Sequence, residues 1–156
     1  YGMVSLTIPK KFSKLKIKEL ADGLAKAAQE FKIKIVGGDT NEGKELVVQI
    51  TLFGTSKKII HRKGSKTNDI IFSTGPFGYS SAGLKIILDR KKANSKFSKK
   101  AKNLVFRPKP RLDFGVAASK FFSSSMDSSD GLSTTLHEMA KQSKKRFIVS
   151  YLLLHR

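Results

Sequence analysis

The chain is organised around one short stretch, Met126-Asp127-Ser128-Ser129-Asp130-Gly131-Leu132. Two carboxylates stand three residues apart, with hydroxyls between them and a glycine after them, which is typical of a tight, oxygen-rich turn. Mg²⁺ is usually held by one or two such carboxylates together with substrate phosphates. A helical pattern follows, and a helix that starts there directs free N–H groups toward a bound anion. The alternative is an ordinary helix start, in which Ser129 or Asp130 caps the first turn.

A second candidate turn, Gly37-Gly38-Asp39-Thr40, follows the short apolar run at 33–36. Glycines at the end of a buried strand permit positive φ and a close approach of the backbone to a ligand. An aspartate beside them can hold a metal while the glycine N–H groups meet phosphate oxygens. The alternative is a plain turn in which Asp39 bonds its own backbone. Neither stretch has the lysine spacing of a Walker A loop or a protein-kinase glycine loop.

Hydrophobic periodicity predicts a mixture of strands and helices, and therefore an α+β fold. We expect strands at 3–8, 33–36, 46–53 and 70–73, with 147–154 compatible with a last strand, and helices at about 16–31, 79–91, 116–122 and 133–142. In the helix at 79–91 we expect Leu84, Ile87 and Leu88 to face inward. Residues 91–102 are expected to form a basic loop or mobile helix end. Prolines make 106–111 an extended connector.

The composition narrows the classes of function. The chain has 156 residues and no cysteine, which excludes disulfides, zinc–thiolate sites and cysteine nucleophiles. The formal net charge of +19 suggests a polyanionic partner such as nucleic acid. Eleven basic residues and one acid, Asp89, lie from Lys85 to Arg111, but few aromatics interleave them. The tract matches no known nucleic-acid module, so we interpret it as a solvated lysine-rich surface and do not expect a nucleic acid as the partner. No apolar run approaches the roughly 18 residues of a membrane span, so the cytoplasm is the default compartment.

Both ends of the chain lie in apolar runs, whereas mature termini are usually polar and loosely held. We therefore expect the chain to be part of a longer protein.

Four motifs, in this order, resemble those of thiamine-monophosphate kinases, within the aminoimidazole-ribonucleotide synthetase-like superfamily. They are Val36-Gly37-Gly38-Asp39-Thr40, Thr74-Gly75-Pro76-Phe77-Gly78, Arg107-Pro108-Lys109-Pro110-Arg111 and the stretch from Met126 to Leu132. The resemblance extends to about residue 148, and residues 150–156 do not look like its continuation.

The resemblance implies two partial mixed α/β domains. Residues 1–58 are expected to form the C-terminal half of an N-terminal ATP-binding and dimerisation domain, and residues 59–156 the first part of a C-terminal domain. ATP and magnesium bind between the two domains in the family. We therefore expect Asp39 and the Asp127/Asp130 turn to face a common cleft.

Position by position, the resemblance also implies a set of binding residues and no catalytic acid or base. Arg62 matches with a one-residue difference in the preceding loop, and its alternative is a surface arginine. The expected nucleotide-binding residues are Gly38, through its backbone, Asp39, Arg62 and Ser129, and the expected magnesium ligands are Asp39, Asp127 and Asp130.

The reaction implied is transfer of the ATP γ-phosphoryl group to thiamine monophosphate, giving thiamine diphosphate. The acceptor phosphate has a second pKa of about 6, so it is largely ionised at neutral pH and needs no general base. Metals neutralise and align the two anions. The resemblance further implies a homodimer of the full-length protein, and we expect this chain alone to be inactive. The alternatives are another ATP-using synthetase of the superfamily and a basic nucleic-acid-binding module.

Overall fold

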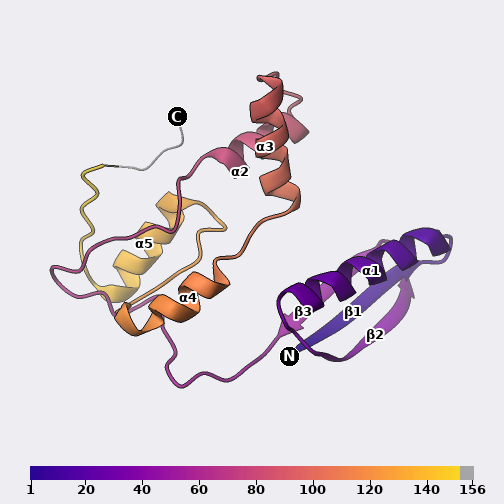
Figure 1. Cartoon of the computed structure of the whole chain (residues 1–156), viewed down its shortest axis with the longest axis horizontal. Helices are drawn as coiled ribbons and strands as arrows, with labels where there is room; N and C mark the ends of the chain where they lie inside the picture. Colours follow the sequence, from indigo (N-terminus) through magenta and orange to yellow (C-terminus); the bar gives the residue numbers. More distant parts are fainter. Residues whose placement is uncertain (152–156) are drawn as a thin grey trace. The chain divides into compact units, whose positions relative to one another are not determined.

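The computed structural model describes residues 1–151. The chain forms two compact units, Tyr1–Lys57 and Lys58–Arg156, which are described separately below (Figure 1). The first unit combines a mixed three-stranded sheet with one helix, and the second is helical with long connecting segments. The predicted α+β class is confirmed. The assignment of the two units to particular domains of the family stays a prediction.

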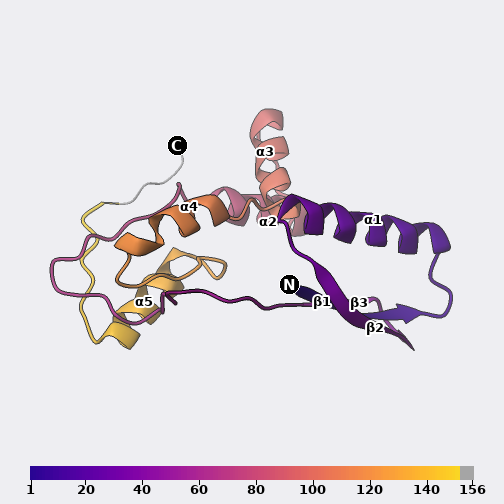
Figure 2. The ribbon, with the colours of Figure 1, turned by 60° about the horizontal axis from the view of Figure 1, so that its bottom comes forward.

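In the first unit the sheet has the order β2-β1-β3, from β1 (Gly2–Pro9), β2 (Ile35–Gly43) and β3 (Val47–Leu52). Strand β1 is parallel to β2 and antiparallel to β3. Helix α1 (Lys14–Glu30) connects β1 to β2 and covers one face of the sheet (Figure 2). A crossover of this kind is what a parallel pair of strands requires.

The two faces of this sheet differ in chemistry because successive side chains of a strand point to opposite faces. On the covered face, Val4 stands opposite Ile50, and both line a small hollow with Leu24 and Phe31 of the helical segment. On the other face, Ser5 stands opposite both Asp39 and Gln49. The open face at its centre is therefore polar, and it presents Asp39.

The predicted strands at 3–8 and 46–53 and the predicted helix at 16–31 are confirmed. The expected turn at Gly37–Thr40 is wrong, because β2 continues through it to Gly43. Gly37 and Gly38 do not adopt positive φ. Gly38 is instead required by strand pairing, since a Cβ at this position would lie 1.9 Å from the carbonyl oxygen of Val4.

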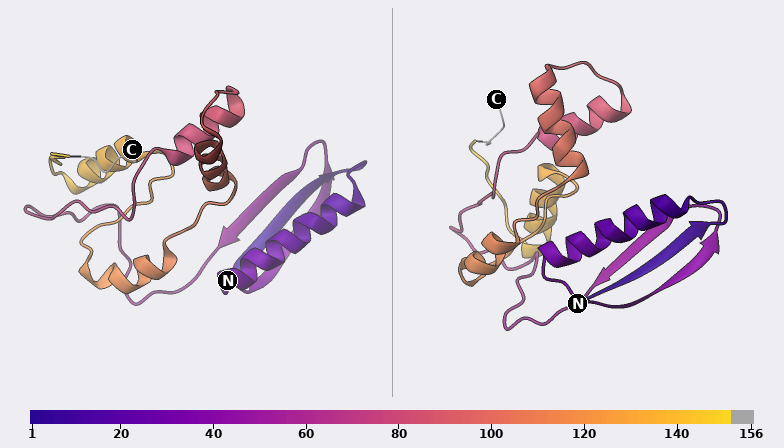
Figure 3. Two further views of the ribbon diagram at one scale, coloured as in Figure 1. Left: turned by 45° about the horizontal axis from the view of Figure 1, so that its top comes forward. Right: turned by 45° about the vertical axis from the view of Figure 1, so that its right-hand side comes forward.

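The second unit contains helices α2 (Tyr79–Leu88), α3 (Ser95–Phe106), α4 (Leu112–Ala118), the 3₁₀ turn η1 (Ser119–Phe121) and α5 (Leu132–Ser143) (Figure 3). Helices α2 and α3 pack where Gly83 meets Ala101, and Tyr79 stacks on Phe97 with ring centroids 5.3 Å apart. The ring of Phe114, in α4, contacts the rings of Phe72 and Phe122 in the connecting segments, with centroid distances of 5.5 and 6.1 Å.

Several expectations for the second unit are wrong. Residues 70–73 form no strand, because no other described segment pairs with them. Residues 95–106 are helical, not a loop, and the side chain of Asn94 accepts hydrogen bonds from the first turn. In α2, Leu84 and Leu88 are exposed, because Gly83 and Ile86 form the face that packs on α3.

The boundaries of the remaining helices agree better with the sequence. The helix expected at 133–142 is confirmed as α5. Helix α4 begins four residues before the expected start at 116, and η1 completes the segment. Residues 147–151 are not a strand, and the rest of the segment 147–154 lies outside the described residues. Within residues 1–151, no helix has the length and apolar character needed to cross a membrane.

Replacing Gly38 with alanine should destabilise the first unit, because the new Cβ must push β1 and β2 apart. Overpacking of this kind typically costs about 1–3 kcal/mol of the free energy of unfolding. Urea denaturation of the chain measures the loss. Gly37→Ala is the matched control, since its Cβ would only touch the Met3 side chain at 3.8 Å. Equal stabilities of the two variants would show that close strand pairing does not select glycine at position 38.

Candidate functional site

The stretch 126–132 forms an exposed turn that leads directly into α5. The Ser129 hydroxyl donates a 2.6 Å hydrogen bond to Oδ2 of Asp127. This bond is the main reason why the pKa of Asp127 lies below its ordinary value, and the nearby positive charge of Arg62 adds a smaller lowering effect. The same hydrogen bond fixes the orientation of the carboxylate, which is the form of aspartate that binds cations.

Arg62 lies beside the same carboxylate. Its Nη2 atom is 3.8 Å from Oδ1 of Asp127, and the two side chains are 53% and 65% exposed. Exposed ion pairs contribute at most about 1 kcal/mol, so this pair cannot by itself fix the guanidinium in place. The structure thus brings together three of the predicted site residues, Arg62, Asp127 and Ser129, from segments more than sixty residues apart.

The turn is anchored to the beginning of α5 by Thr135, one of the few buried polar side chains among residues 1–151. Its hydroxyl lies 3.1 Å from the carbonyl oxygens of both Asp127 and Gly131. Gly131, with φ of +94°, precedes the helix, and no side chain caps the first turn. The alternative interpretation of Ser129 or Asp130 as a helix cap is therefore not what the structure contains. The first N–H groups of α5 stay available to an anion.

The other predicted site residues lie on the first unit. Asp39 is exposed on the polar face of the sheet. Its Oδ1 accepts from the backbone N–H of Thr40 at 2.8 Å, and its Oδ2 accepts from Nδ2 of Asn41 at 2.7 Å. The alternative in which Asp39 bonds its own backbone is thus observed, although on a strand. A common cleft for Asp39 and the Asp127 turn stays a prediction.

The acidic side chains of the site can be compared with the ligands that magnesium requires. Among residues 1–151, no three histidine or acidic side chains gather closely enough to hold a metal ion. Asp127 and Asp130 nevertheless supply two exposed carboxylates on one turn. That set fits an ion which takes one or two protein carboxylates and completes its shell with water and substrate phosphate.

Sequence reasoning missed the residues that hold the Arg62 segment. The Asp69 carboxylate accepts from the Ser123 hydroxyl at 2.5 Å and from the backbone N–H of Lys66 at 2.7 Å. The backbone N–H of Ser125 donates to the carbonyl oxygen of His61 at 3.0 Å. The run of three serines before Met126 was the available signal, because each of them makes a hydrogen bond to the segment from His61 to Asp69.

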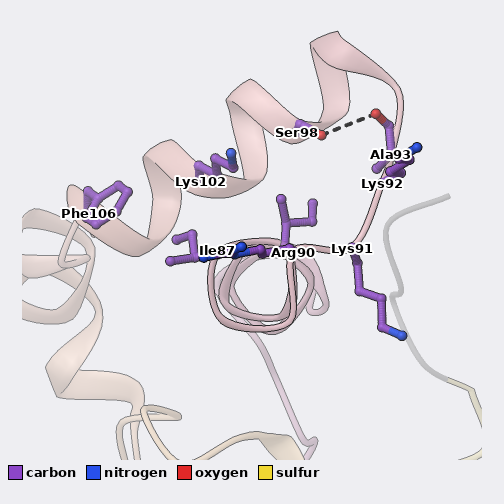
Figure 4. A pocket seen from close by; sticks show the side chains of 9 residues that line it. Ile87, Arg90, Lys91, Lys92, Ala93, Ser98, Lys102 and Phe106 are labelled. Carbon is purple, nitrogen blue, oxygen red and sulfur yellow. Dashed lines mark hydrogen bonds between the residues drawn. The ribbon is translucent and has the colours of Figure 1, made fainter.

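A separate hollow of about 650 Å³ lies between α2 and α3, and no predicted site residue lines it. Figure 4 shows apolar and basic side chains around it, including Ile87, Arg90, Lys102 and Phe106. Lys91 and Lys92 also line it, and within residues 1–151 no acidic side chain does. We call this hollow, with Arg90, Lys91, Lys92 and Lys102 around it, the basic groove.

Comparison with known proteins first defines the class. Residues 1–56 match the family model described as AIR synthase related protein, N-terminal domain. This match covers the β1-α1-β2-β3 unit.

The remaining comparisons identify the relatives more closely. The chain is 55% identical over 150 residues to thiamine-monophosphate kinase of Nitrosopumilus maritimus (strain SCM1), which covers 96% of this chain and 48% of that protein. It is 33% identical to the enzyme of Pyrococcus horikoshii, over 93% of this chain and 46% of that protein. The chain spans about half the length of the curated relatives it matches. It is a homologue of thiamine-monophosphate kinases, and the predicted resemblance is confirmed.

Solved structures agree with this assignment. The structure described as "AaThiL complexed with AMPPCP and TMP" matches with a TM-score of 0.84 and 26% identity, over 92% of this chain and 46% of that chain. Thiamine monophosphate kinase from Aquifex aeolicus matches with a TM-score of 0.83 and 27% identity, over 91% of this chain and 49% of that chain.

The carboxylate of Asp69 should make stability depend on pH. Its hydrogen bonds from Ser123 and Lys66 lower its pKa below the ordinary value. A depressed pKa contributes stability that is present above the pKa of the unfolded chain and is lost as pH falls through the folded value. The melting temperature of wild type should therefore exceed that of Asp69→Asn at pH 6, and the difference should shrink below about pH 4. A difference that stays constant down to pH 2 would contradict this.

Proposed function

We propose that this chain is the nucleotide- and metal-binding half of a thiamine-monophosphate kinase. In the reaction, an oxygen of the thiamine monophosphate phosphate attacks the γ-phosphorus of ATP. The bond from that phosphorus to the β–γ bridging oxygen breaks, which leaves ADP and thiamine diphosphate. Two anions must be brought together, so positioning and charge neutralisation supply most of the catalysis.

The observation that carries the proposal is the grouping of Arg62, Asp127 and Ser129. It combines a cation for phosphate, a carboxylate, and a hydroxyl that orients that carboxylate. The same chain is 55% identical over nearly its whole length to a thiamine-monophosphate kinase. A relative described in complex with AMPPCP and TMP supports ATP and thiamine monophosphate as the ligands.

In this proposal some of the site residues bind the nucleotide and others bind the metal. Arg62, Ser129, Asp39 and the backbone of Gly38 contact ATP, while Asp39, Asp127 and Asp130 hold Mg²⁺. Magnesium, when bound, neutralises phosphate charge and aligns the transferred group. The Ser129 hydroxyl orients the Asp127 carboxylate. No side chain of this chain needs to move a proton, because the acceptor phosphate is already ionised at neutral pH.

The wider assembly is part of the proposal. The two units are proposed as parts of the N-terminal and C-terminal domains of a full-length, cytoplasmic homodimer. The polar face of the sheet, with Asp39 beside Ser5 and Asn41, faces the nucleotide. Another ATP-using synthetase of the superfamily is the closest competing proposal, and it would use the same metal turn with a different acceptor.

Asp127→Asn should slow phosphoryl transfer when the chain is extended to the full length of its relatives. The substitution preserves the shape of the turn and removes one charge, and losing one such electrostatic contact typically costs about 10²–10³ in rate. Folding should change little, because the side chain is exposed. Formation of thiamine diphosphate from thiamine monophosphate and ATP is the measurement.

Asp89→Asn is the matched control. Asp89 follows the last residue of α2 and lies outside both carboxylate motifs, so this variant should retain the rate of the wild-type protein. An Asp127→Asn protein as active as the control would remove Asp127 from the site. Activity toward a different acceptor, with thiamine monophosphate inert, would favour the competing synthetase.

One observation favours a second candidate function, the binding of a nucleic acid. The basic groove carries four cations and no acid, which suits a phosphate backbone. If this is right, the affinity for a single-stranded oligonucleotide should fall steeply with salt, and Arg90→Gln with Lys102→Gln should lower the slope by about 2 on a log–log plot. A flat salt dependence, or no binding, would eliminate it.

A further inference from the structure

The segment that carries Arg62 has no helix or strand to hold it, yet it is tied to its neighbours at several points. The backbone N–H groups of Gly64 and Ser65 both donate to the Ser143 hydroxyl at 3.2 Å. The Ser65 and Ser124 hydroxyls are 2.6 Å apart. Together with the Asp69–Ser123 bond, these contacts form what we call the hydroxyl clamp, made by Ser65, Asp69, Ser123, Ser124 and Ser143.

At Gly64 the segment that carries Arg62 lies very close to the segment that carries Ser123. Its φ is +121°, a conformation that favours glycine, and a Cβ there would lie 2.7 Å from the carbonyl oxygen of Ser123. Arg62 is two residues before this contact. The backbone position of the arginine is therefore set by the clamp and by the hydrogen bond between His61 and Ser125.

Helix α5 links the two sides of the site. Near its beginning Thr135 bonds the carbonyl oxygen of Asp127, and at its last residue Ser143 bonds the segment of Arg62. Eight residues of helix separate these two side chains, a rise of about 12 Å. Since a helix resists bending over two turns, it acts as a spacer between the metal turn and the arginine segment.

We propose that Ser143 is a positioning residue which, through the hydroxyl clamp, holds Arg62 where its guanidinium can meet the phosphates of ATP. The exposed ion pair with Asp127 is too weak to do this alone. The clamp supplies four hydrogen bonds to residues that follow the arginine, and the bond between Ser125 and His61 holds the residue before it. Their sum exceeds the contribution of one exposed ion pair. The inference rests on the proposed function only in taking ATP as the ligand.

The test is a double-mutant cycle on Mg–ATP affinity, in the chain extended to the full length of its relatives. Ser143→Ala should weaken binding about 5- to 10-fold, the effect of one or two lost hydrogen bonds. Arg62→Gln should weaken it at least as much. If Ser143 acts through Arg62, adding Ser143→Ala to Arg62→Gln should weaken binding no further, because coupled residues are not additive. Ser143→Thr, which keeps the hydroxyl, should restore affinity.

Gln142→Ala is the control, because this residue precedes Ser143 on α5 but its side chain donates to Glu138 instead. It should bind Mg–ATP as wild type does. Additive losses in the double variant, or wild-type affinity for Ser143→Ala, would overturn the proposal, as would a wild-type protein that binds no Mg–ATP. A wild-type protein that binds Mg–ATP but forms no thiamine diphosphate would instead contradict the proposed function, and the cycle would still decide the role of Ser143.

Discussion

The hydrogen bond from the Ser129 hydroxyl to Oδ2 of Asp127 is the interaction on which the site depends. It orients a solvent-exposed aspartate and lowers its pKa, and it leaves Oδ1 directed toward Arg62. A carboxylate on a free loop would sample many rotamers, and a metal would have to order it at an entropic cost. Here the Thr135 hydroxyl bonds the backbone of the turn, so much of that entropic cost is met when the chain folds.

The segments around Arg62 and Asp127 keep these two opposite charges near one another without burying them. Buried ion pairs carry a large desolvation penalty, whereas exposed pairs contribute little. In this chain the pair is exposed, and rigidity comes from hydrogen bonds that the Ser143 hydroxyl accepts from backbone N–H groups and that the Asp69 carboxylate accepts from the Ser123 hydroxyl. The metal turn and Arg62 remain open to solvent, and therefore to a nucleotide, while their spacing is set by α5.

Helices and strands with strong hydrophobic periodicity could be predicted from the sequence. The predictions were wrong where contacts between distant segments determine the local structure. The alternation of residues 46–53 and the apolar spacing from Leu20 to Phe31 were sufficient for β3 and α1. The pair Gly37-Gly38 suggested a turn, but only the pairing with Val4 shows that glycine is needed inside a strand. The many lysines between residues 91 and 102 suggested a loop, and α3 was not predicted. The helix forms because packing against α2 and the Asn94 cap outweigh charge repulsion. The turn before α5 was predictable from its own residues, and its metal binding stays a prediction. The clamp joins Ser143 to Gly64 across 79 positions and leaves no local pattern.

The central claim is that Asp39 and the Asp127/Asp130 turn bind the metal of a metal–ATP complex. Paramagnetic Mn²⁺ tests it most directly, as a substitute for Mg²⁺ in an isotopically labelled protein of full length. With ATP present, the amide resonances of Asp127, Ser129 and Asp130 should broaden selectively, those of Asp39 should broaden as well, and excess Mg²⁺ should reverse the effect. Broadening confined to other acidic residues, or none that depends on ATP, would contradict the account.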